Sequence, residues 1–206
     1  MKDSHGQVEV VEKLTRKQQA EQTKQKLLDV SLRLIKEQGY DQVKISDICD
    51  EVGVSIGAFY HHLKNKAGIV TEAYTACDHY FEDIVYPKFK DRYDVEAICD
   101  YLDYQMQYAI DMGVDITIQM YKAQITEGTE FFLLLSRGLP KGLIQVINQL
   151  QEHNVFSNHK TAAEIGNEIL VISRGILYNW CQFHGTYDLK QFNRDIVSKY
   201  IEHYII

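Results

Sequence analysis

The sequence predicts an all-α protein of about nine helices, with an N-terminal three-helix helix-turn-helix domain followed by a larger helical domain. Three observations favour this fold class. Only two prolines and twelve glycines interrupt 206 residues, which favours long helices over the many turns of a sandwich or barrel. Hydrophobic residues make up 45% of the chain, enough for a substantial core. Apolar residues also recur at helical spacing along most of the chain.

The first helices can be placed from their apolar spacing and their caps. Leu27, Leu28, Leu34 and Ile35 predict a core helix over 22–38, and Gly39 follows as a helix-ending glycine. Any helix over residues 16–26 would be a solvated extension, although Thr15 to Gln18 fits a capping box.

A pair of short helices comes next, over 45–52 and 56–63. Gly53 breaks the first, and Ser55 is a suitable N-cap for the second. Asn65 is expected to cap a long helix from Lys66 to about Val85, ahead of Pro87. Two short helices around a glycine turn form a helix-turn-helix, a motif that binds DNA but also occurs in bundles that do not.

Charge is unevenly distributed between the two parts. Residues 13–66 carry ten lysines and arginines against seven acidic residues, whereas residues 67–206 carry eleven against nineteen. A basic N-terminal quarter on an acidic body suggests that the two parts meet different partners, although a solvated charged face would look the same. The net charge of −7 argues against a non-specific polyanion binder.

The cysteines and the apolar runs predict a cytoplasmic protein. Four cysteines, at 49, 77, 99 and 181, form no CxxC pair and are expected to be free thiols. The N-terminal segment has no apolar core, so no signal peptide is expected. The chain has no stretch of 18 uncharged apolar residues, so we expect no membrane-spanning segment and no membrane among its partners. No motif predicts an enzyme, a metal site or a cofactor.

The stretch VGVSIGAFYHHLKNK, residues 52–66, resembles the signature of the tetracycline-repressor (TetR) family of bacterial regulators. The lead-in Gly39-Tyr40 and the segment ISDIC, residues 45–49, resemble it too. The resemblance implies a flexible basic arm over 1–20, a DNA-binding domain over 21–66, and an effector-binding and dimerisation domain over 67–206. It also implies that helix 66–85 is a lever between pocket and DNA. Gly68 and Pro87 are the expected flex points, although Gly68 fits a tolerated surface glycine equally well.

The expected DNA contacts follow from the face that helix 56–63 turns outward if Phe59 and Leu63 are buried. Ser55 and nearby amides are expected to take a phosphate oxygen at the helix N-terminus. The resemblance implies phosphate contacts for Tyr60 and Lys66. Base contacts are expected from Ile56, Gly57, Ala58 and His61, with His62 either at the DNA or packed beside Leu63.

Two positions depart from the family pattern. Lys44 stands where Thr or Ser often caps the second helix, and Ile56 stands where a polar residue is common. We expect Lys44 to contact phosphate as a charge, and Ser46 to cap a helix shortened by about one turn and to join the contact set.

The remaining helices are expected over 94–112, 115–126, 130–136, 139–153, 161–184 and 188–204. Tyrosine and methionine can wall a mainly apolar cavity, and the resemblance implies an effector pocket in this region, for a hydrophobic or aromatic small molecule. An ordinary core would show the same pattern. The expected lining residues are Tyr101, Tyr104, Tyr108, Met120, Tyr121, Phe131, Phe132 and Tyr178.

The last two helices carry long apolar stripes at i, i+4 spacing. By resemblance they pair with a second copy as a four-helix bundle, giving a homodimer; an intrachain core is the alternative. The stripe residues expected at the interface are Ile169, Ile172, Ile176, Trp180, Phe192, Ile196 and Tyr200.

These features predict a one-component transcriptional regulator that is not an enzyme. We expect a repressor that binds palindromic operator DNA as a homodimer and is released by a small-molecule effector. The alternative is a helical interaction protein whose body binds a protein partner instead of a small molecule.

Overall fold

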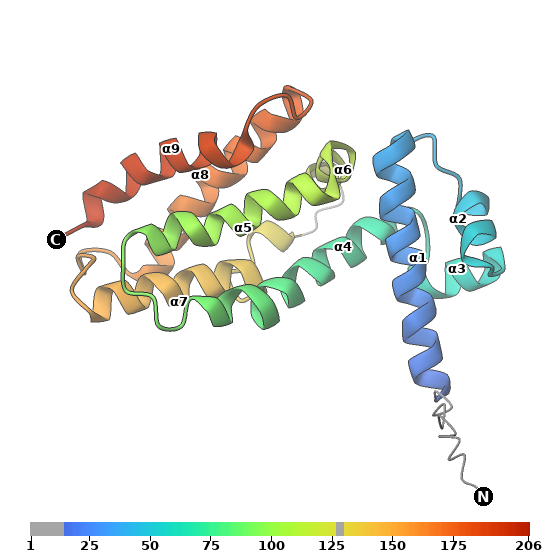
Figure 1. Ribbon diagram of the computed structural model, residues 1–206, viewed down its shortest axis with the longest axis horizontal. Coiled ribbons are helices and arrows are strands. Elements are labelled where there is room, and N and C mark those ends of the chain that lie inside the picture. The colour runs from blue at the N-terminus through green and yellow to red at the C-terminus, as the bar shows by residue number, and fades with distance from the viewer. Residues whose placement is uncertain (1–14, 127–129) are drawn as a thin grey trace, which may run out of the picture.

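The computed structural model describes residues 15–126 and 130–206 and confirms the all-α fold (Figure 1). Nine α-helices lie in these ranges: α1 Arg16–Gln38, α2 Ile45–Val52, α3 Ile56–Leu63, α4 Ala67–His79, α5 Glu96–Met112, α6 Val114–Thr126, α7 Gly138–Glu152, α8 Ala162–Gln182 and α9 Leu189–Ile201. The shorter helices are a π-helix, η1 Tyr80–Val85, and three 3₁₀ turns, η2 Tyr86–Lys88, η3 Glu130–Phe132 and η4 Glu202–Tyr204. No helix in the described ranges is long and apolar enough to cross a bilayer.

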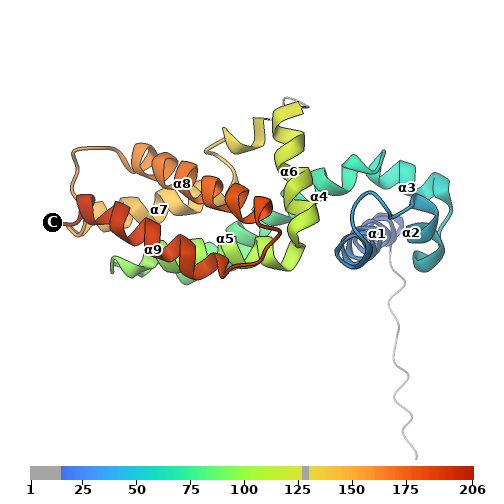
Figure 2. The ribbon, with the colours of Figure 1, turned by 90° about the horizontal axis from the view of Figure 1, so that it is seen from above.

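The helices form a small unit and a larger body joined by α4. Helices α1, α2 and α3 lie together at one end of the molecule, and α4 runs from them into the body (Figures 1 and 2). In the body α7 packs against α8, and α9 packs against both α5 and α8. Helix α6 contacts both parts, because it packs against α1 as well as α5 and α8.

Helix α1 starts earlier than its apolar stripe predicts. Thr15 and Gln18 form a complete capping box, so the solvated first turns are helical from Arg16. Residues 16–20 of the flexible arm expected over 1–20 are therefore helical, and residues 1–14 lie outside the described residues. At the other end, the Gly39 N–H donates to the Ile35 carbonyl as expected.

The helix-turn-helix pair has the expected boundaries, but Ser46 does not cap it. Helix α2 begins at Ile45 with Lys44 as its N-cap residue, which makes no side-chain cap bond. The Ser46 hydroxyl donates to Asp47 instead, at 3.1 Å. Gly53 ends α2 in the left-handed region at φ +78°, which a glycine adopts without strain.

The long helix expected over 66–85 is not one continuous α-helix. The Asn65 side chain accepts from the Gly68 N–H at 2.8 Å, so it supports the start of α4 as expected. Helix α4 ends at His79 and is followed directly by the π-helix η1. Pro87 lies in the 3₁₀ turn η2, which ends this series of helices. Pro87 has no N–H to donate back along the helix, so the α-helix cannot continue through it.

In the body, one expected helix is much shorter. The span predicted over 130–136 holds only η3, and the chain reaches α7 through Arg137, whose backbone is extended. Leu133 and Leu134 are 75% and 45% exposed, so the apolar residues that suggested a helix there are not a buried face. The span predicted over 188–204 is α9 followed by the 3₁₀ turn η4.

The small unit has its own core, to which α6 of the body contributes a fully buried residue. Phe59 and Leu63 of α3 pack with Leu27 and Ile35 of α1, and all four are at most 2% exposed. Ile116 of α6 belongs to this same cluster and is fully buried. The position of α6 is therefore tied to the packing of the helix-turn-helix.

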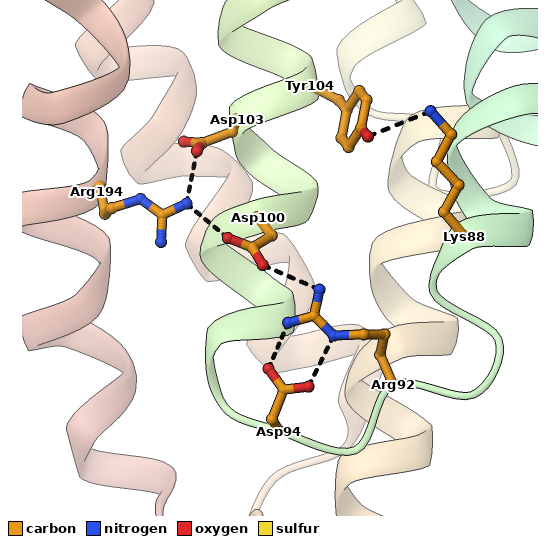
Figure 3. Close-up of polar contacts among 7 residues, drawn as sticks. All are labelled: Lys88, Arg92, Asp94, Asp100, Asp103, Tyr104 and Arg194. Carbon is orange, nitrogen blue, oxygen red and sulfur yellow. Dashed lines mark hydrogen bonds and ion pairs between the residues drawn. The ribbon is translucent and has the colours of Figure 1, made fainter.

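A network of charged side chains holds α9 against α5 (Figure 3). Arg194 of α9 donates to Asp100 and Asp103 of α5, at 2.7 and 2.6 Å. Asp100 also accepts from Arg92 at 3.0 Å, and Arg92 pairs with Asp94. The network lies on the outside of the body, so its role is to fix the position of α9.

The junction between α3 and α4 demands a glycine. A Cβ added at Gly68 would lie 1.7 Å from the Leu63 carbonyl oxygen, far inside contact distance. Gly68 is therefore neither a tolerated surface glycine nor a free hinge, because it lets the start of α4 rest on the end of α3.

Gly68→Ala is expected to lower the free energy of unfolding by about 3 kcal/mol, because the backbone of one helix must move to admit the methyl group. Gly57→Ala is the matched control, since its Cβ would meet only the Ser55 hydroxyl at 3.7 Å. That variant should stabilise the protein by about 0.5 kcal/mol through helix propensity. Urea unfolding of both variants tests this, and equal stabilities would refute the close approach.

Candidate nucleic-acid interface and ligand pocket

Helix α3 turns a mixed polar and apolar face to solvent. Phe59 and Leu63 are buried, whereas Ile56 and Tyr60 are 51% and 50% exposed. Ser55, Gly57 and His61 are also exposed, and Ala58 is half-buried. The Ser55 hydroxyl oxygen accepts from the Ala58 N–H at 3.2 Å, which caps the helix and leaves the hydroxyl hydrogen able to donate.

The basic groups near α3 differ in how far they are already engaged. Lys44 is exposed, and the half-buried Lys66 lies with its ammonium 4.6 Å from the centre of the Tyr40 ring. Lys24 pairs with Glu72 of α4 at 2.7 Å, so its charge is used within the protein. Burial, with the nearby charge of His61, lowers the pKa of the half-buried His62, which favours its neutral form.

A pocket lies in the body, between α4, α5, α6, α7 and α8. The space between these helices is about 710 Å³ when the open mouth is counted. Its wall is mostly aromatic and aliphatic. The residues that line it are Tyr74, Cys77, Asp78, Phe81, Gln105, Tyr108, Ala109, Met112, Thr117, Met120, Tyr121, Phe131, Phe132, Arg137, Leu139, Pro140, Arg174 and Leu177.

Five of the eight expected lining residues face this pocket: Tyr108, Met120, Tyr121, Phe131 and Phe132. Three do not. Tyr101 is fully buried in the core, donating to the Leu139 carbonyl at 3.0 Å. Tyr104 lies outside the pocket lining, and Lys88 donates to its hydroxyl at 3.2 Å (Figure 3). Tyr178 is 49% exposed on α8. The i, i+3, i+7 spacing predicted that the three α5 tyrosines would line one pocket together. The prediction fails for two of them because α5 is packed against several other helices.

Comparison with known proteins gives the same assignment for fold and family. Residues 27–73 match the family model described as "Bacterial regulatory proteins, tetR family". The HTH-type transcriptional regulator AcrR of Shigella flexneri is 24% identical over 215 residues, 92% of this chain and 93% of AcrR. Residues 27–73 thus carry the helix-turn-helix domain of the TetR family of bacterial regulators. The chain is a transcriptional regulator and not an enzyme.

Two further proteins are similar to this chain. IcaR of Staphylococcus epidermidis, a negative transcriptional regulator of a biofilm operon, is 29% identical over 79 residues, 38% of this chain and 43% of IcaR. The fold resembles that of the regulator FadR of Bacillus subtilis in complex with stearoyl-CoA, with a TM-score of 0.68 and 15% identity. That alignment covers 84% of this chain and 95% of FadR.

The tyrosine hydroxyls in the pocket wall already donate hydrogen bonds within the protein. Tyr74 donates to the Met120 carbonyl at 3.0 Å, Tyr108 to the Ala73 carbonyl at 2.9 Å, and Tyr121 to the Arg174 carbonyl at 2.6 Å. Burial raises the pKa of all three, so the phenols stay neutral. These side chains therefore present ring surface more than hydrogen-bond donors.

Sequence reasoning missed the charged residues of the pocket. Arg137 donates to Asp78 at 2.7 Å and to the Tyr74 carbonyl at 3.0 Å. Asp78 also accepts from the Gly138 N–H at 3.2 Å. An arginine far along the chain from its aspartate has no local signal, because 59 residues separate the pair. The ion pair joins α4 to the start of α7.

The interface stripe expected on α8 is wrong in its main residues. Ile169, Ile176 and Trp180 are 0%, 5% and 5% exposed, so they pack inside their own chain. Ile172 and Ile196 are half-buried against the same core. Tyr200 is half-buried and donates to Glu168 at 2.6 Å. Only Phe192 of the expected set is exposed, at 41%.

Asp78→Ala is expected to lower the free energy of unfolding by about 2–3 kcal/mol, because Arg137 would remain 12% exposed without its counter-charge. The double variant Asp78→Ala/Arg137→Met should recover more than half of that loss. Urea unfolding of the three proteins measures this. A single variant as stable as the wild type would show that the pair contributes nothing.

Proposed function

We propose that this chain is a repressor that binds palindromic operator DNA as a homodimer and is released when a small molecule enters the α4–α8 pocket. The observation that carries this proposal is that one helix serves both sites. Helix α4 begins on the end of α3, and its residues Tyr74, Cys77 and Asp78 line the pocket. A ligand that moves this wall would therefore move α3.

The relatives support the two halves of the proposal. IcaR is named a negative regulator, and FadR was solved with stearoyl-CoA, so repression and a bound small molecule both occur among similar proteins. In this chain we assign DNA binding to residues 21–66, and effector binding and dimerisation to residues 67–206.

We propose that α3 enters the major groove of the operator. Ser55, Tyr60, Lys44 and Lys66 would contact phosphates, with Ser46 beside them, and these contacts would set position more than base preference. Base edges would be met by Ile56, Gly57, Ala58 and His61, with His62 at the margin. The exposure of Ile56, Tyr60 and His61 supports this assignment.

A second helix strengthens the coupling between pocket and DNA. Ile116 of α6 is buried in the helix-turn-helix core, while Thr117 and Met120 line the pocket. The hydroxyl of Tyr74 in α4 donates to the Met120 carbonyl, which ties the two helices together. A coupling of about 1–3 kcal/mol, which is about 5–150-fold in affinity, would suffice for a switch.

We propose that the dimer forms through the outer faces of α8 and α9. Val171, Gly175 and Tyr178 lie at i, i+4, i+7 on α8 and are exposed, the first and third at 61% and 49%. Beyond its own helix, no atom of the described residues lies within 4 Å of a Cβ built at Gly175, so a partner helix has room there. Phe192 of α9 adds a ring to this face. The two copies of α3 would then lie about 34–36 Å apart, one turn of DNA.

The proposal is tested by binding to the promoter DNA of the protein's own gene. A gel shift should show preference for one palindromic site over random DNA of equal length, with two protomers bound per site. Absence of any preference would favour the alternative, a helical protein that binds another protein through its body.

Lys66→Ala is expected to weaken binding about equally across operator variants. It should also reduce the dependence of log affinity on log salt by about one unit for each phosphate that is no longer neutralised, hence about two per dimer. Lys90→Ala is the control, because this exposed lysine follows η2 in the body and should leave the salt slope unchanged. A changed base preference with an unchanged slope would contradict the phosphate role.

Val171→Glu is expected to raise the dimer dissociation constant at least about a hundredfold, because a carboxylate would be buried unpaired between two copies. Ile84→Glu is the control, since Ile84 is 52% exposed on η1. Sedimentation equilibrium measures both. A monomer produced by Ile84→Glu, with Val171→Glu still dimeric, would place the interface elsewhere.

A further inference from the structure

The pocket has one positive charge that the described side chains do not neutralise. Arg137 is paired with Asp78, so these two charges cancel. Arg174 of α8 also lines the pocket, and no carboxylate among the described side chains pairs with it. Its guanidinium carbon lies 4.8 Å from the centre of the Phe132 ring. Burial lowers the pKa of Arg174, but an arginine remains charged at neutral pH.

A second polar group in the pocket has no hydrogen-bond partner. Gln105 of α5 is 7% exposed and lines the same cavity, and its Oε1 makes no hydrogen bond within the described part of the chain. A buried amide oxygen left unpaired costs free energy, so native proteins rarely keep one without a reason. Because this oxygen can only accept, a ligand carboxylate cannot pair with it, and the group in this mostly apolar wall that fits a carboxylate is Arg174.

From this we infer that the effector is an apolar molecule carrying a single carboxylate, which Arg174 binds. This inference rests on the proposed ligand-responsive function and narrows it to one ligand class. Arginine presents a planar pair of donors that fits a carboxylate with two hydrogen bonds. The aromatic wall, whose tyrosine hydroxyls already donate to backbone carbonyls, takes the apolar body.

The charge balance also excludes other classes. A cation would meet Arg174 without a counter-charge, and a dianion would retain one negative charge that no described side chain in the pocket offsets. A neutral apolar ligand would leave the Arg174 guanidinium beneath it without a counter-charge. The body of the protein, residues 67–206, is acidic, so this preference comes from the pocket and opposes the overall charge.

Isothermal titration of the full-length protein with three ligands of one shape tests the inference. The probes are 2-naphthoate, 2-naphthalenemethanol and 2-naphthylmethylammonium, and decanoate with 1-decanol repeats the comparison for a linear body. We expect each carboxylate to bind at least tenfold more tightly than its alcohol, and the ammonium to bind least. An alcohol or ammonium that binds as tightly as the carboxylate would overturn the inference.

Variants assign the preference to Arg174. Arg174→Gln should lose at least tenfold in affinity for 2-naphthoate, with the alcohol changed less than threefold. Lys122→Gln removes the same charge from an exposed position of α6 and should leave the preference intact. Arg174→Lys keeps the charge without the paired donors, so it should retain part of the preference and decides the matter if Arg174→Gln does not fold. An unchanged preference in Arg174→Gln would overturn the inference.

Two acids, Glu127 and Glu130, lie outside the described side chains. The variant Glu127→Gln/Glu130→Gln should leave the affinity for 2-naphthoate within threefold. A gain of tenfold or more would mean that the chain itself neutralises Arg174, and would overturn the inference.

Release of operator DNA separates the two levels of the argument. An alcohol that binds and releases DNA where the carboxylate fails would leave the proposed function standing and refute the ligand class. A carboxylate that binds through Arg174 without affecting a demonstrated operator complex would support the ligand class and refute the proposed release.

Discussion

The structure depends on the contact between Gly68 and the Leu63 carbonyl, because it seats α4 directly on the end of α3. With no side chain at position 68, the two helices meet through their backbones, and little can change in one without moving the other. The same helix continues into the body, where Asp78 pairs with Arg137 and joins it to α7. Helix α4 is thus held at both ends by specific contacts, which is what a lever between two sites requires.

The pocket beside α4 is polar in a restricted way. Three tyrosine hydroxyls are directed to backbone carbonyls, which stabilises the wall and leaves the rings to face the cavity. Arg137 is neutralised by Asp78, so it also supports the wall. Among the described side chains, Arg174 has no carboxylate partner, and the Gln105 Oε1 accepts no hydrogen bond. Such a site binds by apolar contact and selects by charge.

The outer faces of α8 and α9 show how burial separates two uses of one amphipathic helix. The longest apolar stripe of α8 is buried in the core of its own chain. Hydrogen bonds from the Arg194 guanidinium to the carboxylates of Asp100 and Asp103 hold α9 in place (Figure 3). What remains exposed is a smaller row on α8, Val171, Gly175 and Tyr178, and Phe192 on α9. A helix that lies between a core and a partner needs two apolar faces, and the weaker one is the candidate interface.

The sequence by itself determined the helix-turn-helix, since its signals are local. Gly39, Gly53 and Ser55 act on neighbouring backbone, and Phe59 and Leu63 are buried at the helical spacing that the sequence shows. It also indicated a pocket, and five of its aromatic and methionine lining residues. Only the tertiary structure decided which face of α5 and α8 is buried, because those helices are apolar on more than one side. It also decided the pairing of Arg137 with Asp78 and the isolation of Arg174, which depend on residues far apart in the chain that no periodicity relates.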